Sequence, residues 1–323
     1  MANAVGSRSR LAARPGFGPA LVGAVRERLV QPLILFSADE EERRAIQALP
    51  GQYLLSVTEA VREARSAARA GIAGVLLLAA PDRHDESAVL ATQPEWVLPR
   101  AIRAIKDALP ELGVATDVCV CAYTSHGQCV LFGADGPDVA ATRRRLGEIA
   151  VAHAQAGADV VVMSGMLEGS VGAVRRALDE AGLRETAVAG VVKFASALYA
   201  PYRAAVGMPF ASERAVPLVP LGDREAALAR ARRDAADGAD VIVVMPGVAS
   251  LDVVAVLHAR LAIAVAAFHV AGEYAMLRAL EESGLEADAI AAEEAIGSRR
   301  AGADLVISYA ARATAEALAE LPS

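Results

Sequence analysis

Three cysteines lie close together in the middle of the chain, at Cys119, Cys121 and Cys129. The aliphatic residues around the first two predict a strand, on which side chains two residues apart point to the same side. The Thr-Ser-His-Gly turn that follows can bring the third cysteine beside them. Three thiolates suit Zn²⁺ and leave its fourth position open, as in catalytic zinc sites. The alternative is that the cysteines pack as small buried hydrophobic residues. We expect His126 to hold the turn or to transfer a proton.

Lys193 is the second residue whose setting indicates chemistry. It lies in the apolar segment Val-Val-Lys-Phe-Ala-Ser, and lysine is almost never fully buried without a partner. Burial lowers the pKa of an amine and leaves it free to attack a carbonyl, so Schiff-base formation is the functional interpretation. The alternative is a structural ion pair with a core carboxylate.

The composition of the chain excludes several classes of protein. The 323 residues carry 32 basic and 39 acidic side chains, a formal charge of −7, and 4% are aromatic. Nucleic-acid binding is disfavoured because a basic stripe and stacking aromatics are missing. The longest apolar region, at 261–280, contains charged residues and predicts no membrane span. Only Lys106 and Lys193 are lysines, so the other 30 basic residues are Arg.

Two further features bear on the compartment. The N-terminus has no compact apolar segment of the kind found in secretory signals, and three cysteines are too few for a disulfide scaffold. We therefore expect a cytoplasmic protein.

The elements that must position these residues form a repeat. Eight short aliphatic runs, each followed by a stretch with helical periodicity, read as buried parallel strands; they lie at 32–37, 72–79, 114–122, 158–164, 187–194, 239–245, 263–270 and 303–309. Similar tetrapeptides at 156–159, 237–240 and 301–304 join a helix to a strand, with Gly in the left-handed position that ends the helix. Eight such units predict an α/β TIM (β/α)8 barrel. A doubly wound sheet is the alternative, but its Gly-x-Gly-x-x-Gly signature is missing.

In a barrel of this type the chemistry lies where strands end and the following loops begin. The residues expected at these ends are Asp117 with Cys119 and Cys121, Ser164, Lys193, Met245, His269 and Tyr309. The longest irregular segment, 200–222, is expected to cover the same face as a lid. We assign residues 1–25 to an N-terminal extension or arm and residues 26–323 to the catalytic barrel.

Several segments together resemble the porphobilinogen synthase (5-aminolevulinate dehydratase) family. They are residues 117–129, with the zinc-type motif Cys-x-Cys-x-Tyr-Thr-Ser-His-Gly-x-Cys, and residues 169–182, 193–203, 272–276 and 300–304. The resemblance covers roughly residues 25–320 in one order. It implies a barrel enzyme that condenses two 5-aminolevulinate molecules into a pyrrole, usually as a homo-octamer, with zinc on the three cysteines.

The resemblance also implies roles for individual residues. In the family two lysines each form a Schiff base with one substrate, and Lys193 matches the first of them. Arg203 and Arg214 match arginines that hold the carboxylate of this substrate. Asp117 matches an active-site aspartate, and Tyr309 matches a tyrosine that helps to bind the carboxylate of the other substrate.

The sequence departs from the family pattern in one of the two substrate pockets. The second lysine of the family stands in a Val-Lys-Pro motif, where this chain has Met245. The serine that binds the second carboxylate is replaced by Ala271, and residues 215–220 lack a glutamine of the lid. These changes would make that pocket apolar and uncharged.

We therefore predict a zinc-dependent lyase or condensing enzyme related to porphobilinogen synthase, in a specialised pyrrole pathway. Lys193, Asp117 and His126 are its expected catalytic residues, acting on 5-aminolevulinate or a related amino-ketone through one Schiff base. The alternatives are an ordinary porphobilinogen synthase and a non-catalytic zinc-binding paralogue. A homo-oligomer, octamer or dimer, is expected, and an additional Mg²⁺ is left open.

Overall fold

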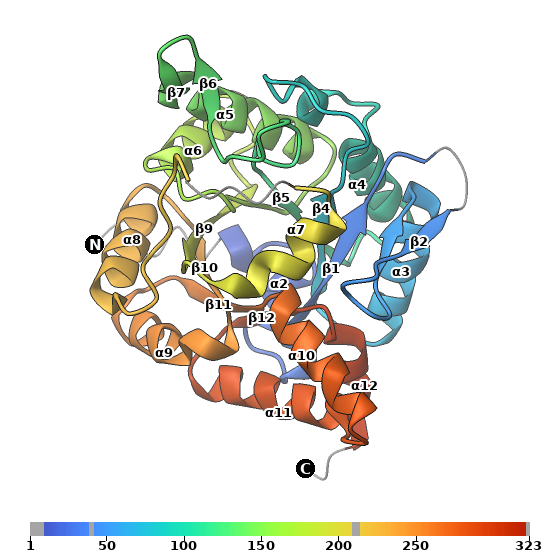
Figure 1. The fold of residues 1–323 in the computed structure, drawn as a ribbon. Helices are drawn as coiled ribbons and strands as arrows, with labels where there is room; N and C mark the ends of the chain where they lie inside the picture. The colour runs from blue at the N-terminus through green and yellow to red at the C-terminus, as the bar shows by residue number, and fades with distance from the viewer. Residues whose placement is uncertain (1–9, 39–41, 209–213, 321–323) are drawn as a thin grey trace.

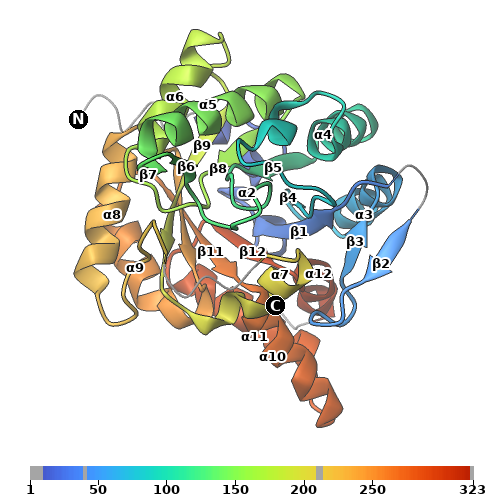
Figure 2. The same cartoon turned by 45° about the horizontal axis from the view of Figure 1, so that its top comes forward.

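Eight parallel strands form a closed barrel in the computed structural model, which describes residues 10–38, 42–208 and 214–320. Each strand pairs with the next along the chain, and the last pairs with the first (Figures 1 and 2). The predicted TIM barrel is confirmed. The barrel strands are β1 (Leu29–Leu35), β4 (Gly74–Ala79), β5 (Gly113–Asp117), β8 (Val160–Val162), β9 (Ala187–Lys193), β10 (Val241–Met245), β11 (Ala264–His269) and β12 (Leu305–Ser308).

Helices surround this barrel on the outside (Figure 1). The principal ones are α3 (Val57–Arg69), α4 (Val97–Ala108), α5 (Val139–Gln155), α6 (Ser170–Glu180), α8 (Arg224–Ala236), α9 (Leu251–Arg260), α10 (Ala271–Glu282), α11 (Ala287–Arg300) and α12 (Ala311–Glu320). Shorter helices are α2 (Phe17–Ala20), α7 (Ala200–Ala205) and the 3₁₀ turns η1 (Arg26–Arg28), η2 (Val89–Thr92), η3 (Ala197–Tyr199) and η4 (Val248–Ser250). No helix among the described residues is long and apolar enough to cross a membrane.

Two pairs of short strands were not predicted. The first extends the barrel sheet: β3 (Tyr53–Leu55) pairs in parallel with β1 and carries β2 (Arg43–Ala45) on its other edge. In the second, β6 (Leu131–Gly133) and β7 (Gly136–Asp138) form a separate hairpin. These strands are three residues long, too short for hydrophobic alternation to mark them.

Alternation along each barrel strand separates two apolar cores. In β10, Val241, Val243 and Met245 belong to the cluster inside the barrel, while Ile242 and Val244 belong to the cluster beneath the helices. The period of two residues follows from the pleat of the strand. Because both faces are covered, the strands are continuous aliphatic runs, as the sequence indicated.

The repeated tetrapeptides connect neighbouring strands at the end of the barrel where the strands begin. Their glycines adopt φ values of +109°, +102° and +103° at Gly157, Gly238 and Gly302, which confirms the predicted role of glycine in these turns. The aspartate of each tetrapeptide accepts a main-chain N–H from the start of the preceding strand, at 2.9 Å from Val114, 2.8 Å from Val188 and 3.0 Å from Val265. Each joint therefore ties two neighbouring strands together.

The N-terminal segment closes the same end of the barrel. Leu11 and Phe17 belong to the interior cluster, and a Cβ placed on Gly113 would lie 2.7 Å from the Phe17 ring. In Figure 1 this dark-blue segment is seen through the ring of strands. Residues 10–25, the described part of the predicted arm, thus pack on the barrel of their own chain, while the division into arm and barrel stays a prediction.

Candidate active site and metal centre

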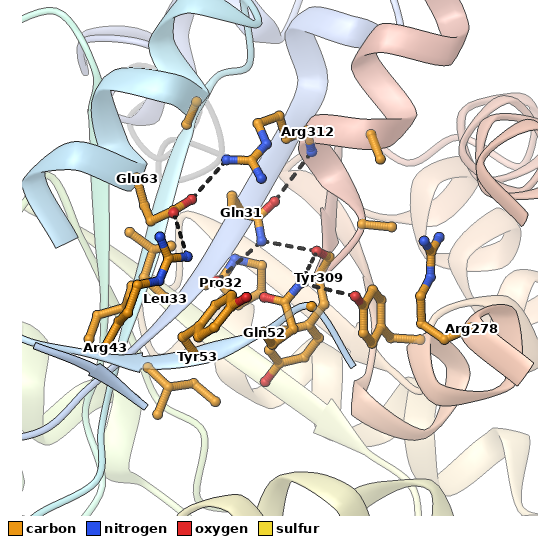
Figure 3. A pocket seen from close by; sticks show the side chains of 17 residues that line it. Gln31, Pro32, Leu33, Arg43, Gln52, Tyr53, Glu63, Arg278, Tyr309 and Arg312 are labelled. Atoms are coloured by element: carbon orange, nitrogen blue, oxygen red, sulfur yellow. Dashed lines mark hydrogen bonds and ion pairs between the residues drawn. The ribbon is translucent and has the colours of Figure 1, made fainter. Parts of the chain in front are cut away.

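Two cavities lie near the barrel strands. The larger, about 340 Å³, lies at the seam between β1 and β12 (Figure 3). The smaller, about 70 Å³, lies at the end where the strands finish, and most of the predicted site residues line it. The lining includes Asp117, Cys121, Cys129, Ser164, Lys193, Tyr199, Tyr202, Arg203, Arg214, Met245, Phe268, Ala271 and Tyr309.

Lys193 is the last residue of β9 and points into the barrel. Ala187, Ala189 and Val191 of the same strand face the interior, so the residue two positions further does as well. Its Nζ lies 4.7 Å from the centre of the Tyr199 ring, a distance at which an ammonium is attracted to the ring face. The ring therefore positions the amine at the floor of the cavity.

Met245 stands directly beside this lysine on the next strand. The two residues are partners in the register of β9 and β10, and neighbouring strands are about 4.8 Å apart. The Tyr199 hydroxyl donates to the Met245 carbonyl at 3.0 Å. A thioether thus occupies the place beside Lys193 from which a second amine would reach the same cavity.

Asp117, the last residue of β5, is held in a setting that favours its protonated form. Burial raises the pKa of this carboxyl to about 6, against the opposing effects of the Ser164 hydroxyl and the Lys193 ammonium. Its Oδ1 has no hydrogen-bond partner among the described residues. A buried acceptor without a partner is costly, so this oxygen is available to a ligand in the cavity.

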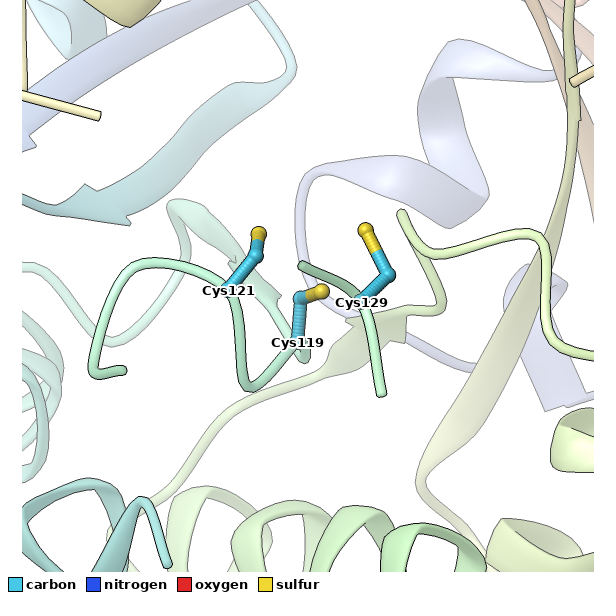
Figure 4. A group of neighbouring side chains, drawn as sticks. All are labelled: Cys119, Cys121 and Cys129. Carbon is cyan, nitrogen blue, oxygen red and sulfur yellow. The ribbon is translucent and has the colours of Figure 1, made fainter. Parts of the chain in front are cut away.

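The three cysteine sulfurs converge, although not in the way predicted. They lie within 4.8 Å of one another (Figure 4). The prediction that Cys119 and Cys121 share a strand is wrong, because β5 ends at Asp117. The last ladder bond there joins the N–H of Val118 to the carbonyl of Val162, at 2.9 Å. The chain then continues as a loop that returns Cys129 to the other two sulfurs.

The electrostatics of the cluster favour one thiolate before any metal is bound. Hydrogen bonds from Cys119 and Cys121 lower the pKa of Cys129 well below its usual value, and the positive charges of Lys193 and Arg214 lower it further. The pKa of Cys119 is raised first by its hydrogen bonds to Cys121 and Cys129 and then by burial. The pKa of Cys121 is also raised, because its hydrogen bond to Cys129, burial and the charge of Cys129 outweigh the lowering effect of the hydrogen bond from Cys119. This pattern is expected when three thiols share one negative charge.

The donor set fits a zinc ion. With Zn–S bonds of ~2.3 Å, tetrahedral ligands are ~3.8 Å apart, so only small shifts would bring the three sulfurs into position. Gly165, in the loop after β8, makes room for the cluster, since a Cβ there would lie 3.1 Å from Cβ of Cys129 and 3.4 Å from Sγ of Cys119. Cys121 and Cys129 also line the cavity that holds Lys193.

The described parts of the predicted lid, residues 200–208 and 214–222, contribute to the cavity lining and are not wholly irregular, while residues 209–213 lie outside the described residues. Residues 200–205 form α7, with Pro201 in its first turn, where proline is well tolerated because the N–H it lacks would be unpaired. The segment returns along the barrel through a bridge between Phe194 and Val219. Arg203 of α7 and Arg214 beyond it both line the cavity.

The structure places Tyr309 and Ala271 in the same lining, and the Tyr309 ring lies 6.2 Å from that of Phe268. It does not place His126 in the lining. The Nδ1 of His126 accepts the N–H of Gln128 at 3.0 Å, and its ring meets Phe132 edge-on at 4.9 Å. The predicted role in holding the turn agrees with these contacts, whereas the catalytic assignment has no contact in the cavity to support it.

Two tyrosines of the lining, Tyr199 and Tyr202, were given no role from the sequence. Both stand in the segment 193–203 that resembles the family. Burial raises the pKa of Tyr202 well above its usual value, so this phenol stays a hydrogen-bond donor. Ser164, which was expected at the end of a strand, lies two residues after β8 and is also in the lining.

Comparison with known proteins gives consistent results over nearly the whole chain. The family model described as delta-aminolevulinic acid dehydratase matches residues 23–317. A delta-aminolevulinic acid dehydratase of Methanothermobacter thermautotrophicus is 42% identical over 269 residues, 82% of each chain. One from Escherichia coli is 36% identical over 291 residues, 89% of each chain.

A solved structure extends this likeness to three dimensions. The delta-aminolevulinic acid dehydratase of Toxoplasma gondii ME49, crystallised in complex with the reaction product porphobilinogen, superposes with a TM-score of 0.87. It is 31% identical, and the match covers 92% of this chain and 88% of that one.

Proposed function

The chain belongs to the delta-aminolevulinic acid dehydratase family, and from this premise we propose a zinc-dependent lyase that holds one amino-ketone as a Schiff base on Lys193. The substrate is 5-aminolevulinate or a close relative. The observation that carries the proposal is the pairing of Lys193 with Met245 in one cavity: one amine is present, and its neighbour has none.

Covalent binding follows from the position of the amine. Nζ of Lys193 attacks the ketone carbon as a free amine, and the carbonyl electron pair moves onto the oxygen. That oxygen takes up two protons in all and leaves as water, while the nitrogen loses its protons and the C=N bond forms. Asp117, with its pKa near 6, and the neighbouring Ser164 hydroxyl are the groups that hold and move these protons.

The remaining lining residues orient the substrate. The guanidinium groups of Arg203 and Arg214 come from the lid, and arginine binds a carboxylate through two parallel hydrogen bonds. The amino-ketone is therefore held with its carboxylate towards the lid and its carbonyl towards Lys193. Closure of the lid over this face also excludes water.

The zinc ion would be held by Cys119, Cys121 and Cys129. When bound, it would supply a Lewis acid that polarises a carbonyl or hydroxyl oxygen at its open position. Cys121 and Cys129 line the cavity that holds Lys193, so a metal held by the three cysteines would lie beside that cavity.

The second substrate cannot be held by a second Schiff base in this pocket. Met245, Phe268 and Ala271 offer no amine and no side-chain hydrogen-bond donor, so the partner molecule is selected by apolar contact and by Tyr309. We propose that this change serves a specialised pathway and not general tetrapyrrole synthesis.

Reductive trapping tests the proposal. Borohydride treatment with 5-aminolevulinate should add the mass of one substrate, less one water and plus two hydrogens, on the peptide that contains Lys193. Lys193→Gln should abolish the adduct. The matched control is Lys106→Arg, because Lys106 is the only other lysine in the sequence and Arg preserves its ion pair with Asp159, 3.1 Å away.

Two results would contradict the proposal. Failure to trap 5-aminolevulinate and other amino-ketones would favour a non-catalytic protein. Release of a pyrrole from 5-aminolevulinate alone would indicate an ordinary porphobilinogen synthase.

A further inference from the structure

The larger cavity lies on the side of the barrel, between α3 and α12, and the proposed reaction does not use it (Figure 3). Strands β1 and β12 are in register over only two pairs of residues. Beyond that point they separate, and the cavity of about 340 Å³ opens between them. This volume is within the range of sites for small molecules.

The sequence of β1 explains why the seam opens. The carbonyls of Leu29 and Leu35 accept hydrogen bonds from the β4 side, at 2.8 and 2.7 Å, so the main-chain groups of Pro32 face the opposite edge, towards β12. Proline has no N–H to donate there. The Gln31 side chain occupies the seam, and its Nε2 donates to the carbonyls of Pro32 at 3.4 Å and Tyr309 at 3.0 Å.

A second amide completes a fixed frame around the cavity. Nε2 of Gln52 donates to the Tyr309 carbonyl at 3.0 Å and to the Tyr274 hydroxyl at 3.2 Å. Oε1 of Gln31 accepts the N–H of Arg312 at 3.3 Å. Because the amide hydrogens are used within the protein, the guanidinium groups are the charged donors that a ligand would meet.

Three arginines and one glutamate line the cavity. Arg278 is already paired with Glu281 and Asp288, each at 2.6 Å, so Arg43 and Arg312 are the cations to consider. Arg312 and Arg43 share Glu63, at 2.8 and 3.2 Å. Arg43 also lies 3.7 Å from Glu59, but that carboxylate is held by Arg62 as well. The side chains of Arg43 and Arg312 are 43% and 46% exposed, and each guanidinium has five N–H donors. One carboxylate therefore leaves both arginines able to bind a further anion.

We propose that this seam cavity binds a small organic anion through Arg43 and Arg312, with a carboxylate or a phosphate as the recognised group. The planar guanidinium fork matches both groups. Tyr309 contributes its carbonyl to the frame of the seam cavity, and it also lines the cavity of Lys193, so the bound anion would lie behind a wall of the active site. Binding here does not depend on the proposed function.

Calorimetric titration of the full chain with succinate and with inorganic phosphate tests the proposal and separates the two groups. The double variant Arg43→Gln/Arg312→Gln should weaken binding by at least about tenfold, as expected for lost hydrogen bonds to a charged group. The matched control is Arg44→Gln. Arg44 is the next residue on β2, pairs with Glu42 at 2.6 Å and lies over the Phe36 ring, outside the cavity.

Two further variants separate this site from the others. Arg203→Gln should leave in place the binding that Arg43→Gln/Arg312→Gln weakens, because Arg203 lines the cavity of Lys193 and not the seam cavity. Ala313→Glu places a carboxylate in the seam cavity on α12 and should abolish binding while keeping the helix, since Glu is a good helix former. Ala313→Glu still tests the proposal if the double variant does not fold. Three results would overturn the proposal. They are an affinity of Ala313→Glu equal to that of the unaltered chain, loss of binding in Arg203→Gln alone, and no binding of either anion to the unaltered chain.

Discussion

The chemistry of the site depends on one position, 245, at the end of β10. Met245 stands in register with Lys193, so an amine at position 245 would have an ammonium neighbour about one strand spacing away. A lysine there would bring a second amine to the same cavity, where it could form a second Schiff base. Methionine removes this nucleophile.

Restoring the amine gives the first prediction. Met245→Lys together with Ala271→Ser should produce a pyrrole from 5-aminolevulinate, because the lysine can bind a second substrate covalently and the serine can donate to its carboxylate. Met245→Lys alone should give little or none. Colorimetric measurement of pyrrole formation checks this outcome.

Met245→Leu with Ala271→Ser is the matched control, because leucine has a similar volume and no amine. Pyrrole formation by this control would contradict the role assigned to position 245. Its absence even in the Lys/Ser double variant would show that the pocket differs at more positions than these two.

A partly buried carboxyl in α11 gives a prediction about pH. Burial raises the pKa of Glu294 from 4.5 to about 7, and its Oε2 has no hydrogen-bond partner among the described residues. His269 lies 4.0 Å away, but burial lowers its pKa to about 4, so it is neutral at pH 7. The folded state thus binds a proton on Glu294 more tightly than the unfolded state does, and stability declines as pH rises from 4.5 to about 7.

Glu294→Gln should therefore stabilise the fold above pH 7 and have little effect near pH 4.5. We expect a gain on the order of 1 kcal/mol in the free energy of unfolding, since part of the side chain is open to solvent, which screens the charge. Urea unfolding of both proteins at the two ends of this pH range measures the difference. A gain of equal size at both ends would mean that the substitution acts through packing.

At the scale of the elements, the order of strands and helices could be predicted, but their ends could not. The aliphatic run at 114–122 extends past β5, which ends at Asp117, because hydrophobicity does not reveal where a neighbouring strand stops pairing. The partner β8 ends at Val162. The cysteines therefore lie on a loop. Their predicted proximity is nevertheless observed, because the turn, and not a shared strand, brings the three sulfurs together.

The seam cavity shows a second limit of the sequence. Arg43, Glu63 and Arg312 come from β2, α3 and α12, and no spacing in the sequence connects them. By contrast, Lys193 could be placed inside the barrel from alternation along one strand. Contacts within an element are thus predictable, whereas those between elements require the closed fold.

The short helix α2 gives the prediction at this scale. Gly113→Ala should destabilise the fold by roughly 1–3 kcal/mol, because the new methyl group would lie 2.7 Å from the Phe17 ring. Phe17→Ala should cost about 3–5 kcal/mol through the loss of a buried ring. In the Phe17→Ala background, however, Gly113→Ala should cost almost nothing. Chemical unfolding of the four proteins forms a double-mutant cycle; additive costs would mean that α2 does not pack on the start of β5.

At the scale of the whole molecule, the site exists only when the barrel is closed. Its groups come from β5, β9, β10 and the segments that follow β8, β11 and β12, and the lid adds two arginines. A chain with a net charge of −7 thus gathers cations and thiols at one end of its barrel. Ligands that need several of these groups at once will stabilise the folded molecule as a unit.

Zinc provides the corresponding prediction. Zn²⁺ added to the metal-free chain should raise the free energy of unfolding by about 2.7 kcal/mol when free zinc is a hundred times its dissociation constant. Denaturation in zinc buffers measures this gain. The variant with all three cysteines changed to Ser should show none. Because Cys119, Cys121 and Cys129 lie within eleven residues of sequence, the unfolded chain also binds some zinc, which makes the gain smaller.

Gly165→Ala distinguishes zinc binding in the folded molecule from binding to the unfolded segment. Gly165 belongs to the loop after β8, and it approaches the cysteines only when β5 and β8 lie side by side in the barrel. A Cβ there would lie 3.1 Å from Cβ of Cys129 and 3.4 Å from Sγ of Cys119, so it would push the sulfurs out of position. In this variant the stabilisation by zinc should fall, while zinc binding to a peptide of residues 117–129 cannot change. A gain equal to that of the unaltered chain would show that the metal is held by the loop alone and not by the assembled barrel.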